Sequence, residues 1–492
     1  MDTAILNDSP IRLQRYHTLP KVMFSESNTS GSSTPSLIEL NENLLKEYGI
    51  DSGWFKSKKG LMTLAGNDTE LMNPPLAMAY SGHQFGHWVP ILGDGRAHML
   101  GQMKTYNDSL IDVQLKGSGR TNYSRGGDGR ATLGSVLREY LISEAMAGLS
   151  IPTTRALAII KTGDMVQREN IVPSAILVRT AASHIRVGTF QYASATQQVS
   201  VIKALADFVI NQHFPEIEQY DDKYVALLNK VIEQQAELIA KWMLVGFIHG
   251  VMNTDNMSIV SETIDYGPCA FMDTFKSNRV FSSIDRYGRY AWDQQATIAV
   301  WNLNCLAETF LPLLDLKTKS AIVVVEEQLA KFTSKFNLFL QQGMIKKFGF
   351  HQCTGKHLEF ISDSLIMLSK QKIDFTLFFN HLTNVNKGDT EGLFLELFSD
   401  REKGIMWLNE WQKLKSDNPE IKLAMRQVNP VFIARNHQVE KAIRAAEDCG
   451  DYSLFKRFAK SLINPFEVSS DNEEFNFPPT PEEIITQTFC GT

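Results

Sequence analysis

The chain has 492 residues, which exceeds the size at which a single core keeps growing, so we expect two packed lobes or one domain with large additions. Hydrophobic residues make up 43% of it and charged residues 21%, as is typical of a globular protein with a sizeable core. The formal net charge of -6 leaves no excess of Lys and Arg to neutralise a polyanion. This argues against nucleic acid as the main partner.

The sequence shows no targeting or membrane signal. The segment from Met1 to Lys21 lacks a basic stretch followed by an apolar run, so we expect no secretory signal and a cytoplasmic location. The most apolar region, Leu238 to Met252, is interrupted by Lys, His and Gly and is too short to span a membrane. The five cysteines have no CxxC spacing, which argues against a zinc site or a disulfide framework.

Hydrophobic patterns predict a β-rich first part and a helical second part. Ile91 to Met103 and Ser109 to Leu115 hold short apolar stretches separated by turn residues, as expected for antiparallel strands. A helix is predicted from Ala131 to about Gly148, because apolar residues recur there at helical spacing. Four later segments also predict helices: from Asp222 through Trp242, Asp293 to Phe310, Thr318 to Leu340, and Val431 to Ala446 after Pro430.

The segment HGVMNTDNMSIVSETIDYGP, from His249 to Pro268, has the spacing of a kinase catalytic loop. In that template an Asn lies five positions after the catalytic Asp, and a later Asp-x-Gly aspartate holds magnesium. Asn256 and Asp265 take the two metal-binding positions. The catalytic position is Val251, whose side chain cannot accept a proton.

Two interpretations of this departure are open: an inactive scaffold, or an active site that uses another base. Asp255 is the candidate base, and the side-chain oxygens of Asn256 and Asp265 are ligands that magnesium prefers. Asn253, Asp255 and Asn256 also fit an Asx-rich turn without any chemistry. The loop by itself does not decide between these interpretations.

A lysine and a glutamate upstream favour a nucleotide site. Lys116 ends an apolar stretch, and Glu139 lies 23 positions later (139 minus 116) in the predicted helix. In the kinase template a strand lysine contacts phosphates and pairs with a glutamate of the next helix. Either residue alone would be an ordinary surface charge. Their order relative to Asn256 and Asp265 favours the functional interpretation.

The tetrapeptide GDGR occurs twice, at Gly93 to Arg96 and at Gly127 to Arg130. Glycine lets backbone amides approach phosphate oxygens, and arginine adds a fork of donors. The second copy immediately precedes the helix predicted from Ala131, whose N-terminus favours anions. Arg179 and Arg186 fit either phosphate contacts or structural ion pairs, and their residue pattern favours the structural role.

Taken together, these motifs resemble the selenoprotein O family of kinase-like protein adenylyltransferases over nearly the whole chain. The matching segments are YSGHQFG (80–86), LGDGR (92–96), YSRGGDGRATLGSVLRE (123–139), IPTTRAL (151–157), HGVMNTDNMS (249–258), DYGP (265–268), WNL (301–303), NPVFIARN (429–436) and NPF (464–466).

The resemblance implies an α+β, protein-kinase-like two-lobe fold with terminal extensions. Residues 1–75 would form an N-terminal extension, 76–178 the β-rich N-lobe, 179–465 the helical C-lobe, and 466–492 a C-terminal tail that contains Cys490.

The resemblance also implies that ATP binds in a flipped orientation and that AMP passes to Ser, Thr or Tyr hydroxyls of protein substrates, with pyrophosphate released. Mg²⁺ is the expected metal, with Mn²⁺ left open, and we expect a monomer without membrane or nucleic-acid partners. The alternatives are a Mg-ATP phosphotransferase, against which Val251 argues, and a pseudokinase that binds nucleotide without catalysis.

At matching positions the resemblance implies that Asp255 accepts the proton, that Asn256 and Asp265 bind the metal, and that Glu139 orients Lys116. Nucleotide contacts carry over to nine residues: Gly93, Gly95, Arg96, Lys116, Asp128, Gly129, Arg179, Arg186 and Asp265. Cys490 occupies the family's C-terminal redox position. This chain has Phe281 near the place where some relatives have a partner cysteine, so we do not expect an intramolecular disulfide at that place; pairing of Cys490 elsewhere, a mixed disulfide and no redox role are left open.

Overall fold

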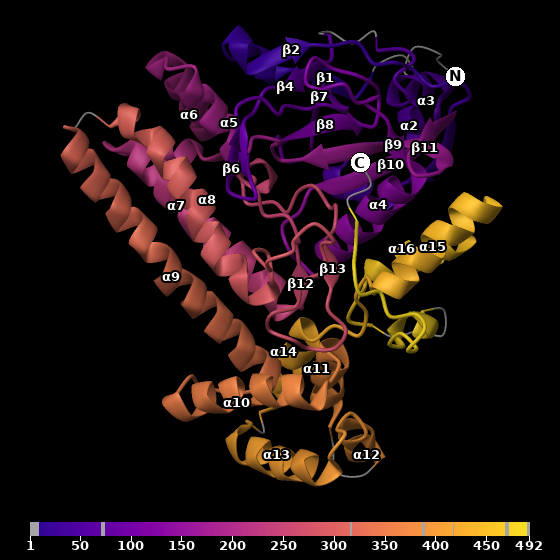
Figure 1. Cartoon of the computed structure of the whole chain (residues 1–492), viewed down its shortest axis with the longest axis vertical. Coiled ribbons are helices and arrows are strands. Elements are labelled where there is room, and N and C mark those ends of the chain that lie inside the picture. Colours follow the sequence, from indigo (N-terminus) through magenta and orange to yellow (C-terminus); the bar gives the residue numbers. More distant parts are fainter. Residues whose placement is uncertain are drawn as a thin grey trace.

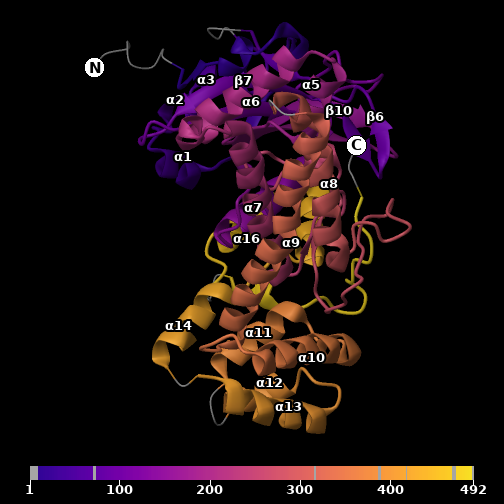
Figure 2. The same ribbon diagram turned by 90° about the vertical axis from the view of Figure 1, so that its left-hand side faces the viewer.

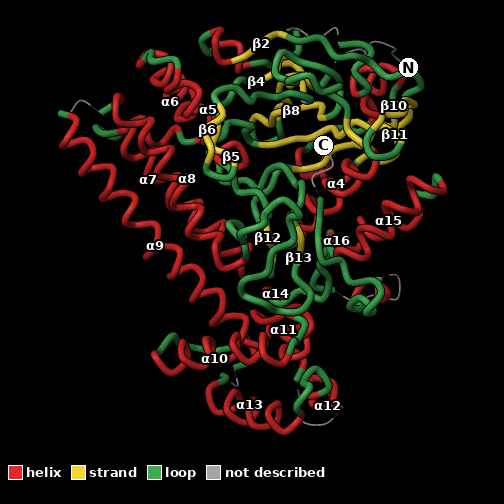
Figure 3. Tube along the Cα trace, viewed as in Figure 1, coloured by secondary structure: helices red, strands yellow, loops and turns green. Residues whose placement is uncertain are grey.

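The structure is a computed structural model that describes residues 9–69, 74–314, 317–385, 389–416, 418–467 and 472–489. A large antiparallel sheet lies at one end of the molecule, and helices make up most of the remainder (Figures 1 and 3). This arrangement confirms the predicted α+β class. Cys490 lies outside the described residues.

The main sheet has nine strands in the order β2-β4-β7-β8-β11-β10-β3, with β1 paired to β7 and β9 to β11. The predicted strand pair is present as β7 and β8, although the first residues of the predicted segment, 91–96, are not in a strand. The strands are β1 Ile11–Leu13, β2 Phe24–Glu26, β3 Ser36–Leu40, β4 Leu76–Met78, β7 Ala97–Lys104, β8 Leu110–Lys116, β9 Ala131–Thr132, β10 Arg155–Gln167 and β11 Ile171–Ala181.

Helices cover both faces of this sheet. Leu115 of β8 packs on one face with residues of α1 (Glu42–Tyr48), α2 (Gly53–Lys56) and α3 (Lys58–Leu64). Leu177 of β11 points to the opposite face, where it packs with α4 (Leu133–Gly148). Alternate residues of a strand face opposite sides, so Lys116 lies on the α4 side, opposite to Leu115. The sheet thereby places the candidate lysine beside the candidate glutamate.

Of the other described helices, α5 and α6 lie at the level of the sheet, and the rest form the body below it and the lower end of the molecule (Figure 2). None of them combines the length and apolar character needed to cross a membrane. They are α5 Val187–Ala195, α6 Val199–His213, α7 Lys223–Leu244, α8 Gln295–Phe310, α9 Thr318–Phe348, α10 Gly355–Gln371, α11 Phe375–Asn384, α12 Asp389–Leu395, α13 Arg401–Leu414, α14 Pro419–Val428, α15 Asn436–Cys449 and α16 Ser453–Leu462.

The helix predictions are confirmed for α4, α7, α8 and α9, with ends that differ by a few residues except at the C-terminus of α9. The predicted end of α9 was Leu340, but the helix continues to Phe348 and stops at Gly349, which has a φ of 70°. The left-handed conformation at this cap is one that glycine adopts without a steric penalty. A glycine cap therefore ends the helix eight residues (348 minus 340), or about two turns, beyond the predicted boundary.

The predicted start of α15 at Val431 is wrong. The backbone amides of Val431 and Phe432 donate to the carbonyl oxygen of Pro465, at 2.7 and 3.0 Å, and Arg435 has a non-helical ψ of 133°, so tertiary contacts hold this segment outside the helix. Arg435, the residue before the helix, is buried and forms an ion pair with Asp374 at 2.8 Å. Tertiary hydrogen bonds and a buried charge thus override the local preference of proline for a first helical position.

Segments from both ends of the chain contact the central part. β1, β2 and β3 belong to the first 75 residues and pair within the main sheet. Near the other end, the backbone amide of Thr488 donates to the carbonyl oxygen of Phe281 at 2.7 Å, and the amide of Ser283 donates to Thr488 at 3.1 Å. The described tail therefore adds a short bridge to the loop that follows Asp265.

A buried lysine in the lower helical region has no role in the candidate site. The side chain of Lys347 in α9 is 2% exposed, and its Nζ lies 4.2 Å from the ring centroid of Phe379. Nζ donates to the carbonyl oxygen of Val428 at 3.4 Å, and no carboxylate among the described residues forms an ion pair with it. Burial lowers the pKa of Lys347 to about 7.

Lys347→Met is expected to stabilise the protein at pH 7, because the unfolded chain keeps a charged lysine that the folded chain cannot solvate. The folded-state pKa is below the unfolded value, so this cost is largest below pH 7 and disappears as pH rises towards about 10. The stability advantage of the variant should shrink by up to about 1.4 kcal/mol per pH unit over that window. Denaturant titrations at pH 7, 8 and 9 measure the difference, with exposed Lys346→Met as the control. A difference that does not change with pH would contradict the prediction.

Candidate functional site

The sheet register and helix α4 bring Lys116 and Glu139 together. Lys116 is the last residue of β8, and Glu139 lies in the second turn of α4, which follows β9 along the same sheet. The Nζ of Lys116 lies 2.6 Å from Oε2 of Glu139, and both side chains are largely buried. A buried ion pair of this kind holds the lysine in one geometry.

Arg179 joins this pair from the neighbouring strand. In the antiparallel pairing of β11 and β8, Arg179 stands directly opposite Gln114, so both side chains lie on the α4 face with Lys116. The guanidinium of Arg179 donates to Oε1 of Gln114 at 2.5 Å and contacts Glu139 at 3.2 Å. Arg179 is fully buried and therefore needs these acceptors.

Arg186 approaches from a different element. It precedes α5, and its strand-like backbone pairs with Ser258 in the candidate catalytic loop. Its guanidinium carbon lies 4.5 Å from the ring centroid of Tyr80, and its NH2 lies 3.3 Å from Oδ2 of Asp265. The aromatic ring and the carboxylate hold Arg186 beside Asp265, where Lys116, Arg179 and Arg186 together form a cation cluster.

Asp265 is the carboxylate on which three cations converge. Its Oδ1 lies 3.1 Å from Nζ of Lys116 and 2.6 Å from NH1 of Arg179, while Oδ2 faces Arg186. Burial alone would raise the pKa of Asp265, but Arg186, Lys116 and Arg179 outweigh it and hold the pKa well below its usual range. Asp265 is therefore ionised at neutral pH. Its φ of 62° is unusual for a non-glycine residue and aims the carboxylate at these cations.

The candidate catalytic loop follows β12 (Phe247–Ile248), which pairs with β13 (Ala270–Phe271). His249 is buried, contacts the carbonyl oxygen of Ile264 at 2.9 Å, and stacks on Trp242 of α7. Asn256 donates from Nδ2 to the carbonyl oxygen of Val251 at 2.9 Å, which leaves its side-chain oxygen for another partner. The buried side chain of Val251 offers no proton acceptor at the kinase position.

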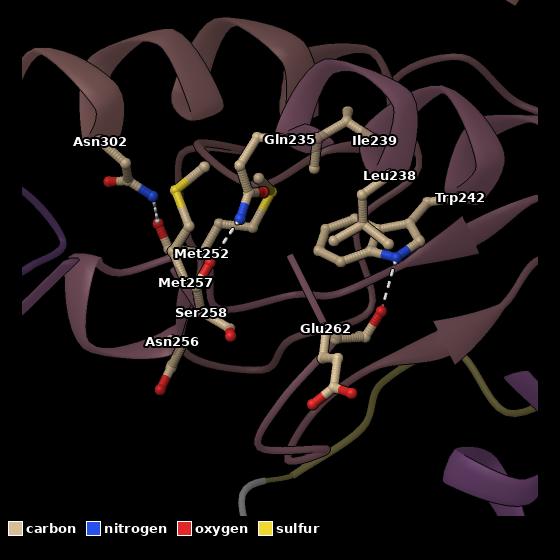
Figure 4. Close-up of a pocket in the computed structure, with 11 residues that line it drawn as sticks. Gln235, Leu238, Ile239, Trp242, Met252, Asn256, Met257, Ser258, Glu262 and Asn302 are labelled. Atoms are coloured by element: carbon tan, nitrogen blue, oxygen red, sulfur yellow. Dashed lines mark hydrogen bonds between the residues drawn. The ribbon is translucent and has the colours of Figure 1, made fainter. Parts of the chain in front are cut away.

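Side chains from α7 and α8 hold the back of this loop (Figure 4). Gln235 donates to the carbonyl oxygen of Ser258 at 2.7 Å, and Asn302 donates to that of Met252 at 3.0 Å. The cavity between these side chains measures only about 10 Å³, which is room for one water molecule at most. The side chains around this cavity therefore support the loop, and the cavity itself is too small for a nucleotide (Figure 4).

Asp255 is buried next to a hairpin of two short strands, β5 (Gly82–Gln84) and β6 (His87–Val89). Its Oδ2 accepts a hydrogen bond from Nε2 of Gln84 at 3.2 Å, and its Oδ1 is buried without a partner among the described residues. Burial raises the pKa of Asp255 to about 6, although the hydrogen bond from Gln84 opposes the shift. A carboxylate with this pKa is largely ionised at neutral pH and can accept a proton.

The two GDGR copies lie in different environments. In the first copy, buried Asp94 accepts a hydrogen bond from Gln114 at 3.0 Å, which links Gly93 and Gly95 to the cluster around Arg179. The carbonyl oxygen of Arg96 accepts a hydrogen bond at 2.7 Å from the amide of Gly117, next to Lys116. The first copy therefore borders the cation cluster.

The second GDGR copy contacts the β10–β11 hairpin and the turn that follows β8. Asp128 is exposed and forms a 2.7 Å ion pair with Arg168 in the β10–β11 hairpin. Gly129 has a φ of 71°, and its carbonyl oxygen accepts a hydrogen bond from the amide of Gly119 at 3.1 Å. A Cβ at Gly129 would lie 2.1 Å from the Gly119 backbone, so only glycine fits. Among the described residues, neither Asp128 nor Gly129 forms a hydrogen bond or ion pair with Lys116, Arg179, Arg186 or Asp265.

Sequence reasoning missed two site residues, Gln114 and Gln84. Gln114 lies two positions before Lys116 on a strand, so period-two alternation would have placed it on the same face. Gln84 lies in the family-matching segment YSGHQFG, but no local periodicity pairs it with Asp255, which lies 171 positions away. The first residue was accessible to local pattern analysis and the second was not.

The donor set near Asp265 fits a divalent cation. Asp265 supplies an ionised carboxylate, and the side-chain oxygen of Asn256 has no hydrogen-bond partner among the described residues. These are oxygen donors of the kind that Mg²⁺ and Mn²⁺ accept. Both oxygens of Asp265 contact cationic side chains, so a bound cation would share this carboxylate with Lys116, Arg179 and Arg186.

Comparison with known proteins gives a consistent result. The model of the family described as protein adenylyltransferase SelO matches residues 13–463. A protein nucleotidyltransferase YdiU of Shewanella denitrificans is 50% identical, with 98% of each chain covered. Proteins of the same name from Halalkalibacterium halodurans and Clostridium botulinum are 47% and 46% identical, each with 97% of this chain covered and with 97% and 96% of the relative covered.

Proposed function

Because the chain belongs to the SelO family of protein adenylyltransferases, we infer that it transfers AMP from ATP to protein side chains. The observation that carries this inference in the molecule is the convergence of Lys116, Arg179 and Arg186 on Asp265. Three largely buried cations around one carboxylate support a polyphosphate site, because the cations can neutralise the negative charges of the phosphates.

We propose a protein-kinase-like arrangement of two lobes for this chain. The N-lobe would comprise residues 76–178 and the helical C-lobe residues 179–465, with 1–75 as an N-terminal extension and 466–492 as a tail. An antiparallel sheet with α4 packed on one face, followed by a long helical region, supports this arrangement. The Lys116–Glu139 ion pair, at 2.6 Å, corresponds to the strand-lysine and helix-glutamate pair of kinases.

In the proposed complex, Lys116, Arg179 and Arg186 bind the triphosphate, and Glu139 orients Lys116. The three cations already lie within hydrogen-bonding or ion-pair distance of Asp265, so they need little reorganisation to meet phosphate oxygens. The backbone of Gly93, Gly95 and Arg96 borders this cluster. Asp128 and Gly129 would contact the nucleotide from the more distant GDGR turn. A flipped nucleotide, with its α-phosphate towards the acceptor, is part of the same proposal.

Asp255 is the proposed proton acceptor. Its carboxylate takes the proton of the acceptor hydroxyl as the hydroxyl oxygen forms a bond to the α-phosphorus. The bond from the α-phosphorus to the bridging oxygen breaks, and pyrophosphate leaves with the electron pair. Asn256 and Asp265 would hold the metal, which neutralises phosphate charge when bound.

The finer features of the reaction remain part of this proposal. We propose Ser, Thr and Tyr as acceptors, Mg²⁺ as the working metal with Mn²⁺ as the alternative, and a monomeric protein in the cytoplasm that does not act on nucleic acid. Cys490 is proposed as a redox-sensitive thiol of the tail. The loop residue Phe281 offers it no disulfide partner.

The experiment that tests the function uses ATP labelled on either the α- or the γ-phosphate. The purified protein is incubated with Mg²⁺ and each nucleotide, and protein-bound label is measured after denaturation. Adenylyl transfer predicts that the α-label alone becomes protein-bound. Retention of the γ-label would identify a kinase, and retention of neither label under any metal condition would favour a nucleotide-binding scaffold.

A further inference from the structure

The hairpin of β5 and β6 has no role in the function described above, although it lies against the proposed base. Its strands pair Gly82 with Val89 and Gln84 with His87 across a two-residue turn. Both turn residues, Phe85 and Gly86, have positive φ values, 53° and 85°. Two positive φ values match the tight turns whose twist suits a hairpin.

Three consecutive hairpin residues bind three consecutive residues of the catalytic loop. The amide of His83 donates to Oγ1 of Thr254 at 2.7 Å, and the amide of Phe85 donates to Oδ1 of Asn253 at 3.0 Å. Between them, Nε2 of Gln84 donates to Oδ2 of Asp255 at 3.2 Å. The backbone contacts on both sides place the Gln84 side chain opposite the Asp255 carboxylate.

Two further contacts keep the hairpin in this register. A Cβ at Gly82 would lie 2.9 Å from Oδ1 of Asp255, so a side chain there would press on the carboxylate. On the other side, the ring of Phe85 packs edge-on against the ring of Tyr290, with 5.1 Å between the ring centroids. The hydroxyl of Tyr290 donates to Oδ1 of Asn253 at 2.6 Å. These contacts offset the unfavourable left-handed backbone of Phe85.

The two oxygens of Asp255 differ as a result. Oδ2 is held by the Gln84 amide, whereas Oδ1 is buried and has no hydrogen-bond partner among the described residues. A carboxylate with one oxygen held by a hydrogen bond has a defined orientation.

We propose that Gln84 is a positioning residue for AMP transfer, which holds Oδ2 of Asp255 so that the carboxylate keeps the one orientation in which it accepts the proton of the acceptor hydroxyl. This inference rests on the proposed role of Asp255 as proton acceptor. Gln84 itself touches neither the nucleotide nor the acceptor in this arrangement. It acts by restricting the carboxylate to the orientation in which proton transfer is possible.

The test compares Gln84→Met with Gln191→Met. Methionine preserves the length of the side chain and removes the donor. Gln191 of α5 is a matched control, because its Nε2 bonds Nδ1 of His83 on the same hairpin at 2.9 Å, whereas in the described part of the chain it forms no hydrogen bond with Asp255. Loss of a hydrogen bond to a charged group predicts that kcat falls about ten- to hundredfold in Gln84→Met. The KM for ATP should stay within about twofold, and Gln191→Met should keep both constants.

A double-mutant cycle separates this inference from the proposed function. If Gln84 acts through Asp255, adding Gln84→Met to Asp255→Asn should not lower the residual rate further. Equal losses in the Gln84 and Gln191 variants, or additive losses in the cycle, would overturn the positioning role. Unchanged kcat in Gln84→Met beside a disabled Asp255→Asn would overturn this inference alone. Full activity of Asp255→Asn would instead overturn the proposed base. An ATP-induced rise in melting temperature shows that each variant is folded.

Discussion

Asp265→Asn is expected to lower the rate of AMP transfer by about a thousandfold or more, while ATP binding without metal persists. The substitution keeps the shape of the side chain but removes the negative charge that lies within 3.3 Å of Lys116, Arg179 and Arg186. A metal that neutralises phosphate charge contributes several kcal/mol to transition-state stabilisation, which corresponds to a rate factor of this order.

Binding and labelling should therefore separate in this variant. The three cations lose a shared carboxylate and become more available to the triphosphate, so calorimetry with ATP in the presence of a chelator should detect binding at least as tight as in the parent protein. The rate is measured with α-labelled ATP and Mg²⁺. Asp164→Asn is the matched control, because Asp164 also faces an arginine, Arg130 at 3.7 Å, but lies outside the cluster. Full labelling by Asp265→Asn would refute the proposed metal ligand.

Asp255→Asn should lower kcat by about 10²- to 10⁴-fold, the usual range for loss of a positioned general base. Asparagine occupies the same volume, so the buried loop should keep its conformation, but its amide cannot take the proton of the acceptor. The KM for ATP should change little, because the phosphate-binding cations belong to other elements. Single-turnover labelling at saturating ATP measures the effect. The control is Asp221→Asn, because the side chain of Asp221 is exposed to solvent.

A different result in this experiment would change the proposed mechanism. If Asp255→Asn labels protein at the parent rate, the acceptor hydroxyl loses its proton to another group or to solvent. The buried position of Asp255 and its pKa of about 6 would then require a structural explanation. Val251 cannot replace it, because its side chain has no proton-accepting atom.

Short-range spacing predicted the first part of the site. The strand that ends at Lys116 and the helix that contains Glu139 are each defined by local hydrophobic periodicity, and the two residues form a 2.6 Å ion pair in the structure. The spacing of residues in the loop likewise identified Asn256 and Asp265 as candidate metal ligands. Period-two alternation would also have identified Gln114 beside Lys116.

Long-range contacts decided the remainder. Arg179 and Arg186 by themselves favoured a structural role, and only the sheet register and the start of α5 bring both to Asp265. The helix predicted after Pro430 begins instead at Asn436. Hydrogen bonds to Pro465 and the ion pair of Arg435 with Asp374 hold residues 431–435 in a non-helical conformation.

The sequence by itself determined the α+β class, the main helices and the order of the candidate ligands, since these depend on propensity and periodicity over a few residues. The tertiary structure decided which side chains meet across the chain, such as Gln84 and Asp255, separated by 171 positions. The physical reason is that local preferences of a few tenths of a kcal/mol per residue define elements but not their partners. A buried polar group without a hydrogen-bond partner costs about 1–3 kcal/mol, so the packed chain favours the arrangement in which such groups meet their partners.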